Sequence, residues 1–334
     1  MAVMMGFPRL LSECGLDPNA FIRHHGCDPA LFRNPDNLID FSAIGRLLAQ
    51  VAAESDCRYP GLEIGRQHGL DVMGAVGRIA RLAPDLGTAL RCIVLHMHLH
   101  DRGSVPYIWT NEEQALFGYI LYCADVTGTE HIYDGALAIA YNFICELLGP
   151  DWRPTEVRFF RDRPEDTAPF SAHFRGVLRF RAQQAAVVFP AADLRRPSVN
   201  ADSDRYAAAL RDLETLDAAF SGGLADKVRR LLRHLMVTGA FLSVPALDRA
   251  TLATLLGLHP RSLNRRLRAE GTTFAALLDE CRYAIARELL RDTHLLVQDV
   301  AFLLGYAERA SFDHAFRRWS GMAPKTWRAL LAGA

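Results

Sequence analysis

The spacing of apolar residues changes along the chain and divides it into three stretches. Up to about residue 99, apolar residues recur at intervals of three and four, which predicts helices, most clearly over residues 38–53 and 86–99. Between about residues 105 and 189 the pattern is mixed, and from residue 224 onward it is helical throughout. Within the mixed stretch we predict strands at 115–122, 156–160 and 185–189 and an apolar helix at 135–148. The fold class predicted is therefore an α+β N-terminal domain followed by an all-α domain.

The boundary between these domains is predicted at Ser221-Gly222-Gly223, the clearest helix-breaking segment before the last stretch. A helix over residues 206–220 leads into it. We therefore divide the chain into residues 1–200, a linker helix with its glycine breaker at 201–223, and a C-terminal domain at 224–334.

The C-terminal domain contains an internal repeat at a separation of 48 residues. Residues 252–257 and 300–305 both end in glycine, with an alanine four residues earlier, at Ala253 and Ala301. A small residue lets two short helices cross closely, and glycine permits the tight turn between them. In each copy a second helix follows, anchored by an apolar pair four residues apart: Leu263 with Leu267, and Phe312 with Phe316. The repeat predicts two helix-turn-helix units.

One long helix is predicted to join the two units. Residues 273–291 carry a single apolar stripe, and a helix of that length spans about 28 Å. Such a rod places two recognition helices about one DNA turn apart, roughly 34 Å. One chain then has the means to read two successive major grooves.

The polar sides of the second helices supply the predicted DNA contacts. Arginine and asparagine suit bidentate reading of guanine and adenine edges, whereas an acidic residue accepts a bond from cytosine but repels phosphate. The second copy, which contains Asp313, is therefore expected to read bases less strongly. The predicted contacts are Arg261, Ser262, Asn264, Arg265 and Arg268 in the first copy and Arg309, Ser311, Asp313, His314, Arg317 and Arg318 in the second.

The charge distribution agrees with this assignment. The chain has no net charge, yet residues 225–334 hold 17 Lys and Arg against 10 Asp and Glu. The preceding residues carry the opposite balance. A basic module attached to an acidic one indicates that the C-terminal part meets a polyanion.

These residues resemble a known family. The segment from Gly305 to Phe312, then Ala315 to Trp319, then Gly321-Met322-Ala323-Pro324 and Trp327-Arg328 is similar to the signature of the AraC/XylS regulators of bacterial transcription. Trp327 stands where that family usually has tyrosine. The resemblance covers about a quarter of the chain and implies a sequence-specific regulator, most often an activator, with promoter DNA and RNA polymerase as partners.

The N-terminal part is similar, more loosely, to the ligand-binding domain of AraC-type regulators of the ornithine-utilisation kind. The residues that carry this likeness are Gly61-Leu62-Glu63-Ile64-Gly65, Leu86-Gly87-Thr88-Ala89-Leu90 and Val187-Val188-Phe189-Pro190, with Leu194 and Pro197. It implies a domain that binds a small metabolite effector and forms a homodimer. It does not identify the metabolite.

Candidate effector contacts are polar and aromatic residues near the middle of the chain. We predict His96, His98, His100, Tyr107 and Trp109, with Phe117 and Tyr119 as further aromatic candidates. The alternation of the three histidines, followed by Asp101, also suggests a metal site. On the predicted helix, however, residues two apart diverge by about 200°, so we predict no metal and no cofactor.

Other functions lack a motif. The seven cysteines form no CxxC pair and are expected to be reduced, and no nucleophile motif or phosphate-binding loop is present, so we predict no enzyme. The alternatives are an alkyl-accepting repair protein fused to a DNA-binding module and an architectural DNA-binding protein without an effector. We expect no signal peptide or membrane span, and a cytoplasmic location.

Overall fold

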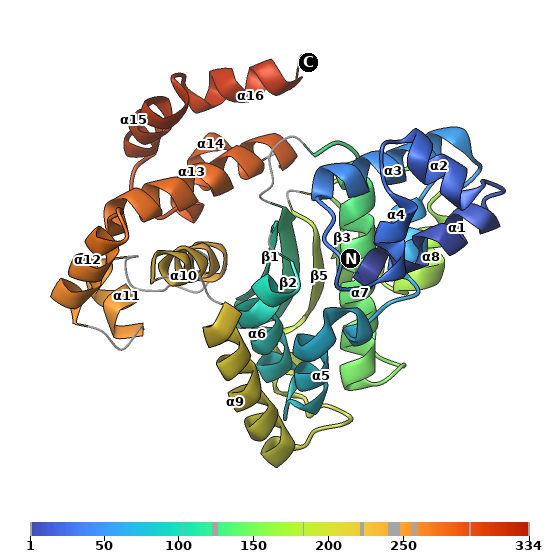
Figure 1. Ribbon diagram of the computed structural model, residues 1–334, viewed down its shortest axis with the longest axis horizontal. Helices are drawn as coiled ribbons and strands as arrows, with labels where there is room; N and C mark the ends of the chain where they lie inside the picture. Colours follow the sequence, from blue (N-terminus) through green and yellow to red (C-terminus); the bar gives the residue numbers. More distant parts are fainter. Residues whose placement is uncertain are drawn as a thin grey trace.

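The computed structural model describes residues 2–101, 103–121, 126–182, 184–220, 224–239, 248–255, 259–293 and 295–332. Helices and a mixed sheet make up the N-terminal part, and helices alone make up the C-terminal part (Figure 1). The predicted fold class is confirmed. The predicted breaker at residues 221–223 and the first turn glycine, Gly257, lie outside the described residues.

The first hundred residues form helices, as their apolar spacing predicts. Two of them begin at aspartates that cap the helix: the Asp40 side chain accepts a hydrogen bond from the Ala43 amide at 2.7 Å, and Asp85 accepts one from Thr88 at 2.7 Å. These caps fix where α3 and α6 begin. The elements are η1 (Ala2–Gly6), α1 (Phe7–Glu13), α2 (Pro18–His24), η2 (Pro29–Arg33), α3 (Phe41–Glu54), α4 (Pro60–Gly65), η3 (Leu70–Met73), α5 (Gly74–Leu82), α6 (Leu86–His96) and η4 (Met97–Leu99).

A five-stranded sheet follows, in the order β1-β2-β5-β3-β4. All neighbours are antiparallel except β3 and β4. Two strands were not predicted: β1 contains Pro106 and lies at an edge, where a missing backbone donor is tolerated, and β4 is only three residues long. The strands are β1 (Ser104–Thr110), β2 (Gln114–Leu121), β3 (Glu156–Arg158), β4 (Val177–Arg179) and β5 (Ala186–Pro190), with α7 (Thr129–Leu148), α8 (Ala168–Phe174) and η5 (Ala191–Arg195) between or after them.

The C-terminal part contains the predicted repeat. Gly305, at the second turn, has a positive φ of 77°, and Ala253 and Ala301 are fully buried. The joining helix α13 has 19 residues, as the sequence predicts. The linker helix α9 (Ser203–Phe220) packs against α5, and the helices after it are α10 (Leu224–Gly239), α11 (Arg249–Leu255), α12 (Pro260–Ala269), α13 (Phe274–Asp292), α14 (Val297–Leu303), α15 (Arg309–Ser320) and α16 (Pro324–Ala332).

The two faces of the sheet belong to different apolar cores. Phe117 and Val187 point into the N-terminal core, beneath α7. Their neighbours Leu116 and Val188 point the other way and share a core with the C-terminal helices. Helix α10 forms this contact and lies against β1 and the C-terminal helices (Figure 1). The sheet is therefore the wall between the two parts of the molecule.

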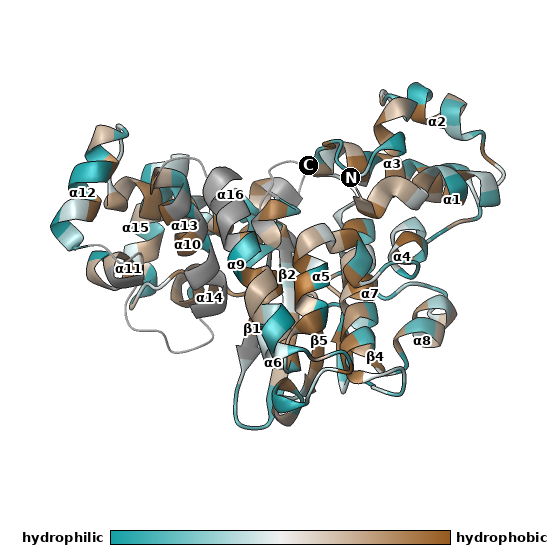
Figure 2. Ribbon diagram, turned by 60° about the horizontal axis from the view of Figure 1, so that its bottom comes forward, coloured by the Kyte–Doolittle hydropathy of each residue, from teal (hydrophilic) through white to brown (hydrophobic). Residues whose placement is uncertain are grey.

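The hydropathy of the helices and strands agrees with this packing. Figure 2 shows β5 and α7 coloured largely as hydrophobic, whereas α12, at the far end of the C-terminal part, carries hydrophilic positions. No helix among the described residues is both long and apolar enough to span a bilayer.

Candidate nucleic-acid interface and effector cavity

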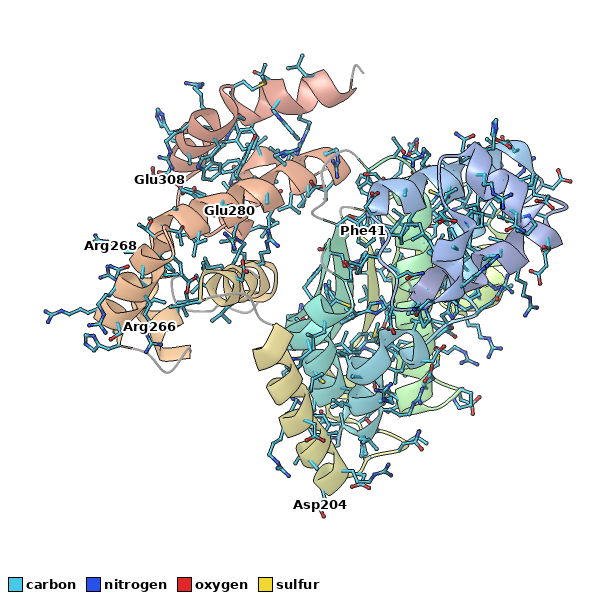
Figure 3. The ribbon with its side chains drawn as sticks, viewed as in Figure 1. Phe41, Asp204, Arg266, Arg268, Glu280 and Glu308 are labelled. Carbon is cyan, nitrogen blue, oxygen red and sulfur yellow. The ribbon has the colours of Figure 1, made fainter. Side chains whose placement is uncertain are left out.

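Helix α12 presents a row of unpaired arginines. Leu263 and Leu267 are fully buried and fix which side of the helix faces the core. The side chains of four arginines are exposed and form no hydrogen bond or ion pair with the described residues: Arg261, Arg265, Arg266 and Arg268. Figure 3 labels two of them, Arg266 and Arg268, in the C-terminal part. Four free guanidinium groups on one short helix form a surface suited to a polyanion.

Three of these arginines are predicted contacts. Arg261, Arg265 and Arg268 lie on the side opposite the buried leucines, with Asn264 and Ser262 half-buried beside them. Arg266 was not predicted, because it lies nearer the core side of the helix. Arg266 is a candidate DNA contact because its side chain is exposed in the structure.

Helix α15 differs because two of its three arginines, Arg309 and Arg318, have partners within the protein. Arg318 donates to the carboxylate of Asp279 on α13 at 2.7 Å. Arg309 and Asp313 form an ion pair at 3.4 Å. Arg317, His314 and Ser311 are exposed and form no such contacts with the described residues. The two helices therefore offer different numbers of free donors.

Aromatic packing and a hydrogen bond to a backbone carbonyl stabilise the second helix-turn-helix unit. The Arg282 side chain donates to the Leu304 carbonyl at 2.9 Å, next to the end of α14, and its guanidinium lies 4.5 Å from the centre of the Tyr306 ring. Trp327 packs edge-on against Phe316, with ring centres 5.8 Å apart. Trp327 thus supplies aromatic packing at the position where the family usually has tyrosine.

Helix α10 connects the DNA-facing part to the sheet. Its first free amides, those of Leu224 and Ala225, each donate to the carboxylate of Glu270 at 2.8 Å, just after α12. Arg229 on α10 donates to Glu280 on α13 at 2.9 Å (Figure 3 labels Glu280). These bonds tie α10 to the first helix-turn-helix unit. A displacement of α10 must therefore reach that unit.

A cavity of about 550 Å³ lies on the other face of the sheet. It is lined by residues of η1, α3, α4, η3, η4, α7 and the sheet, and its walls are mostly aliphatic and aromatic side chains such as Phe41, Phe117 and Phe143. Figure 3 labels Phe41 at this site. A cavity of this size and lining is typical of a small-molecule site.

Two polar features interrupt the apolar lining. At the first, Asp101 accepts hydrogen bonds from the Tyr119 hydroxyl at 3.0 Å, from the Gly103 amide at 2.7 Å and from the Ser104 hydroxyl. At the second, His131 is buried on α7, and its Nδ1 has no hydrogen-bond partner among the described residues. Burial lowers the pKa of His131 and of His100, so both rings are neutral near pH 7.

Some of the predicted effector residues line the cavity, and others lie elsewhere. His100 lines the cavity, as do Phe117 and Tyr119. Tyr107 lies on the opposite face of the sheet, in the core shared with α10, because successive strand residues alternate in direction. His96 is buried at the end of α6 and is not part of the lining. The side chains of His98 and Trp109 lie outside the described residues. His131 was not predicted, since a lone histidine in a helix gives no signal.

Close packing of two helices forms one wall of the cavity. A Cβ added to Gly61 on α4 would lie 1.8 Å from the carbonyl oxygen of His131, and one added to Gly65 would lie 2.5 Å from that of Gly135. The segment 61–65 thus requires glycine at both ends. This gives a physical reason for the glycines in one of the segments that carry the family resemblance.

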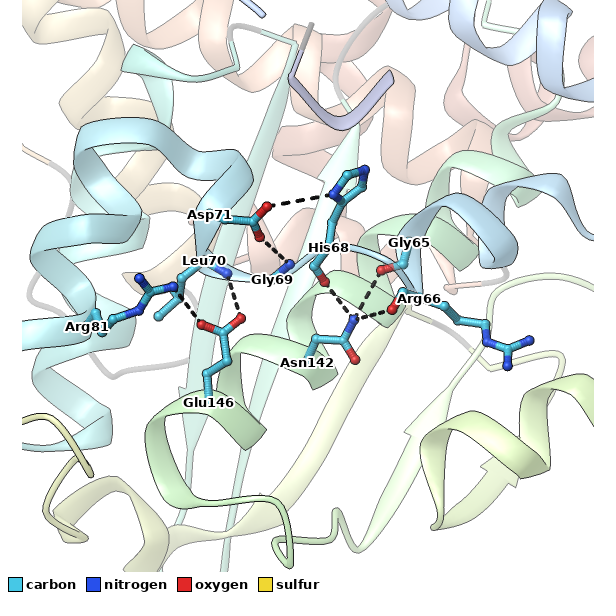
Figure 4. Close-up of polar contacts among 9 residues, drawn as sticks. All are labelled: Gly65, Arg66, His68, Gly69, Leu70, Asp71, Arg81, Asn142 and Glu146. Atoms are coloured by element: carbon cyan, nitrogen blue, oxygen red, sulfur yellow. Dashed lines mark hydrogen bonds and ion pairs between the residues drawn. The ribbon is translucent and has the colours of Figure 1, made fainter. Parts of the chain in front are cut away.

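The same wall is locked by polar groups of α7. The Asn142 side chain donates to the carbonyl of His68 at 2.6 Å and to those of Gly65 and Arg66 at 3.2 Å (Figure 4). Glu146 accepts from the Leu70 amide at 3.1 Å and from Arg81 at 2.9 Å. The two polar residues that interrupt the apolar helix therefore fasten the loop after α4.

The described residues do not support metal or nucleophile chemistry. They contain no group of three His, Cys, Asp or Glu side chains placed to hold a metal ion. Burial raises the pKa of Cys57 to about 12 and those of Cys92 and Cys281 to about 11. An activated thiol needs the opposite shift. Cys123 lies outside the described residues.

Two family descriptions match the chain. Residues 15–198 match the arabinose-binding domain of AraC transcription regulators, and residues 252–330 match a helix-turn-helix domain. These are the two parts that the fold separates.

Known proteins are similar over nearly the whole length. The HTH-type transcriptional regulator VirS of Mycobacterium tuberculosis is 29% identical, over 98% of this chain and 95% of its own. The ornithine utilization regulator of Pseudomonas aeruginosa is 27% identical, over 96% and 93%. The crystal structure of the transcriptional regulator CdpR from Pseudomonas aeruginosa covers 93% of this chain and 96% of its own, with 24% identity and a TM-score of 0.46.

Proposed function

The chain belongs to the AraC family of transcription regulators, and we propose that a small molecule in the N-terminal cavity controls its recognition of promoter DNA. The observation that carries the DNA-binding part is the row of four exposed arginines on α12 that form no ion pair with the described residues, at Arg261, Arg265, Arg266 and Arg268. Arginine binds both phosphate and guanine through two parallel hydrogen bonds. The helix-turn-helix order of α11 and α12 makes α12 the recognition helix.

The two recognition helices are expected to contribute unequally. On α12 the guanidinium groups are free, whereas on α15 Arg318 is held by Asp279 and Arg309 by Asp313. DNA binding at α15 must break these pairs or leave those arginines out. We therefore propose that the first unit supplies most of the base reading, and that Arg317, His314 and Ser311 position the second unit.

The operator follows from the length of α13. A helix of 19 residues spans about 28 Å, which is close to the rise of one DNA turn, roughly 34 Å. One chain is thus proposed to bind two short elements on the same face of the duplex, about 10 base pairs apart.

Effector control is proposed to pass through the sheet. Phe117 faces the cavity, while the preceding residue, Leu116, belongs to the core that contains Val228 and Leu232 of α10. A molecule that shifts β2 therefore shifts the surface on which α10 rests. Because Glu270 holds the start of α10, the first DNA-binding unit moves with it. Control also requires that the effector bind the two states with different affinity.

Selection of DNA fragments with the purified full-length protein tests the proposal. At near-physiological salt we expect a motif with two elements about one helical turn apart. Recovery of fragments with no common motif would contradict sequence-specific recognition. Repeating the selection after addition of a bound small molecule tests control, and identical affinity and transcription in both conditions would refute it.

The remaining parts of the proposal concern the cellular context. We propose that the protein acts in the bacterial cytoplasm as an activator that contacts RNA polymerase, and that the N-terminal domain forms a homodimer. In vitro transcription with and without the protein gives the direction of regulation. Sedimentation or light scattering gives the oligomeric state.

A further inference from the structure

The chemistry of the cavity specifies the kind of effector, given the proposed function. The lining combines more than a dozen aliphatic and aromatic side chains with the Asp101 cluster and a few other polar residues, among them His131. A buried polar group without a partner is costly, because it gives up its hydrogen bonds to water and regains none. A ligand with polar groups around its whole edge therefore lacks partners here.

A pentose is such a ligand, although the matching family is described as arabinose-binding. Each hydroxyl of a sugar needs a donor or acceptor once it leaves water. The described lining offers such groups at only a few points, so the residues present do not fit arabinose.

The Asp101 cluster presents acceptors to the cavity. An ionised carboxylate has about four acceptor positions, and Asp101 uses three of them for Gly103, Ser104 and Tyr119. Tyr119 gives its proton to Asp101, so its oxygen faces a ligand as an acceptor. Burial and the neighbouring Asp101 raise the Tyr119 pKa well above its ordinary value, which keeps the hydroxyl neutral. A ligand group at this point must donate.

The described lining offers no lysine or arginine side chain to an anionic group of a ligand. Arg102 lies outside the described residues. The two histidines that line the cavity are neutral near pH 7, and Asp101 and Asp40 add acidic character. A carboxylate or phosphate placed here loses its water without gaining a lysine or arginine partner from the described lining.

We infer that the cavity binds a mainly apolar small molecule that carries one hydrogen-bond-donating head, a hydroxyl or an amine, held by Asp101 and Tyr119. The apolar remainder fills the space between Phe41, Phe117 and Phe143.

Calorimetric titration of the full-length protein tests the inference without DNA. The probes are straight-chain alcohols, amines and carboxylates of about eight to twelve carbons, together with arabinose. We expect saturable binding of an alcohol or amine, at least about tenfold tighter than the matching carboxylate, as one charge-assisted hydrogen bond implies. Equal or tighter binding of the carboxylate, tighter binding of arabinose, or no saturable binding of any alcohol or amine overturns the inference.

Variants separate recognition from folding. Tyr119→Phe removes only the hydroxyl, and Asp101→Asn keeps the shape of the side chain. Each is expected to weaken binding of the donor-headed probe about tenfold, while Asp204→Asn, at the far end of α9, leaves it unchanged (Figure 3). Thermal melting without probe checks that each variant folds. Unchanged binding in a folded Tyr119→Phe and a folded Asp101→Asn overturns the assignment.

The proposal of effector control and the inference on the ligand class can be refuted independently. If the donor-headed probe binds but leaves DNA affinity unchanged, effector control fails and the ligand class stands. If DNA affinity responds to a polar or anionic metabolite instead, control stands and the ligand class fails.

Discussion

The ring of Tyr107 lies directly against Gly118 on the neighbouring strand, so that a Cβ added to Gly118 would lie 2.2 Å from Tyr107 Cζ. These residues are paired in the register of β1 and β2. Gly118 lines the cavity with its backbone, and Tyr107 belongs to the core shared with α10. The pair is thus a point of contact between the effector cavity and the DNA-binding part.

Gly118→Ala is expected to displace the Tyr107 ring and with it the surface under α10. Overpacking of this kind costs about 1–3 kcal/mol, and we also expect a weaker response of DNA affinity to a bound effector. Urea unfolding and DNA titration measure the two effects. In a Tyr107→Ala background the added methyl has no ring to meet, so the cost of Gly118→Ala should largely disappear. An equal cost in both backgrounds would show that the ring contact is not its source.

Arg265→Ala is expected to weaken DNA binding more than Arg318→Ala does. The Arg265 side chain is free on α12, whereas that of Arg318 is held by Asp279. If Arg265 reads a base, the loss is about 1–3 kcal/mol and is confined to one operator position. A loss that is uniform across operators and reduces the salt dependence identifies a phosphate contact instead. Equal losses in the two variants would contradict the proposed asymmetry.

Gly61→Ala is expected to destabilise the N-terminal domain by pushing α4 away from α7. The added methyl would meet the His131 carbonyl, and the backbone cannot move aside as a flexible side chain does. A cost of about 1–3 kcal/mol is expected from thermal or urea unfolding. Gly6→Ala is the matched control, because its Cβ meets nothing closer than 3.8 Å. If both variants have the same stability as the parent, the packing argument is wrong.

Asn142→Leu is expected to release the loop that follows α4. The amide of Asn142 lies within hydrogen-bond distance of three carbonyls, and an apolar side chain removes this donor from all three, although Gly65 keeps a bond from the His68 amide. A cost of about 1–3 kcal/mol follows, along with faster hydrogen exchange in residues 65–70. Asn37→Leu is the control, since that side chain donates to the carbonyls of Ala30 and Leu31 in η2, away from residues 65–70. Unaltered exchange at 65–70 would contradict the anchoring role.

Stability is expected to fall as the pH drops below about 6.5, through buried neutral histidines. Burial is the largest cause that lowers the pKa of His173 from 6.5 to about 4, and the pKa values of His100 and His131 move in the same direction. In this window the unfolded chain binds protons that the folded chain does not. Each group therefore removes up to about 1.4 kcal/mol per pH unit. By about one pH unit above 6.5 the histidines are neutral in both states, and their effect vanishes.

Urea unfolding between about pH 5 and pH 8 measures this dependence. His173→Gln should reduce its slope, since glutamine does not titrate. His24→Gln, at the end of α2, is the control. A slope identical to that of the parent in His173→Gln would show that His173 does not supply it.

The C-terminal domain was largely predictable because its determining contacts are local. Leu263 with Leu267, and Phe312 with Phe316, lie one helical turn apart, so their spacing alone orients each recognition helix. The turn at Gly305 and the length of α13 also follow from neighbouring residues. What the spacing did not indicate is that Asp279 holds Arg318, because that partner belongs to another helix 39 residues away.

The N-terminal site was predictable only in part. The sequence marked His100, Phe117 and Tyr119 as candidates, and all three line the cavity. It also grouped Tyr107 with them, although the edge strand β1 directs that side chain to the opposite face. Strand residues point alternately to the two faces of a sheet, so which face Tyr107 occupies cannot be assigned until the strand boundaries and register are known.

The sequence by itself determined the order of the two domains, the helix-turn-helix repeat and the basic surface of α12, because each depends on residues close together along the chain. Only the tertiary structure decided which side chains line the cavity, that His131 is one of them, and that α10 rests on the opposite face of the same sheet. The physical reason is that the cavity wall draws on segments from Val3 to Phe143, and only folding brings these together.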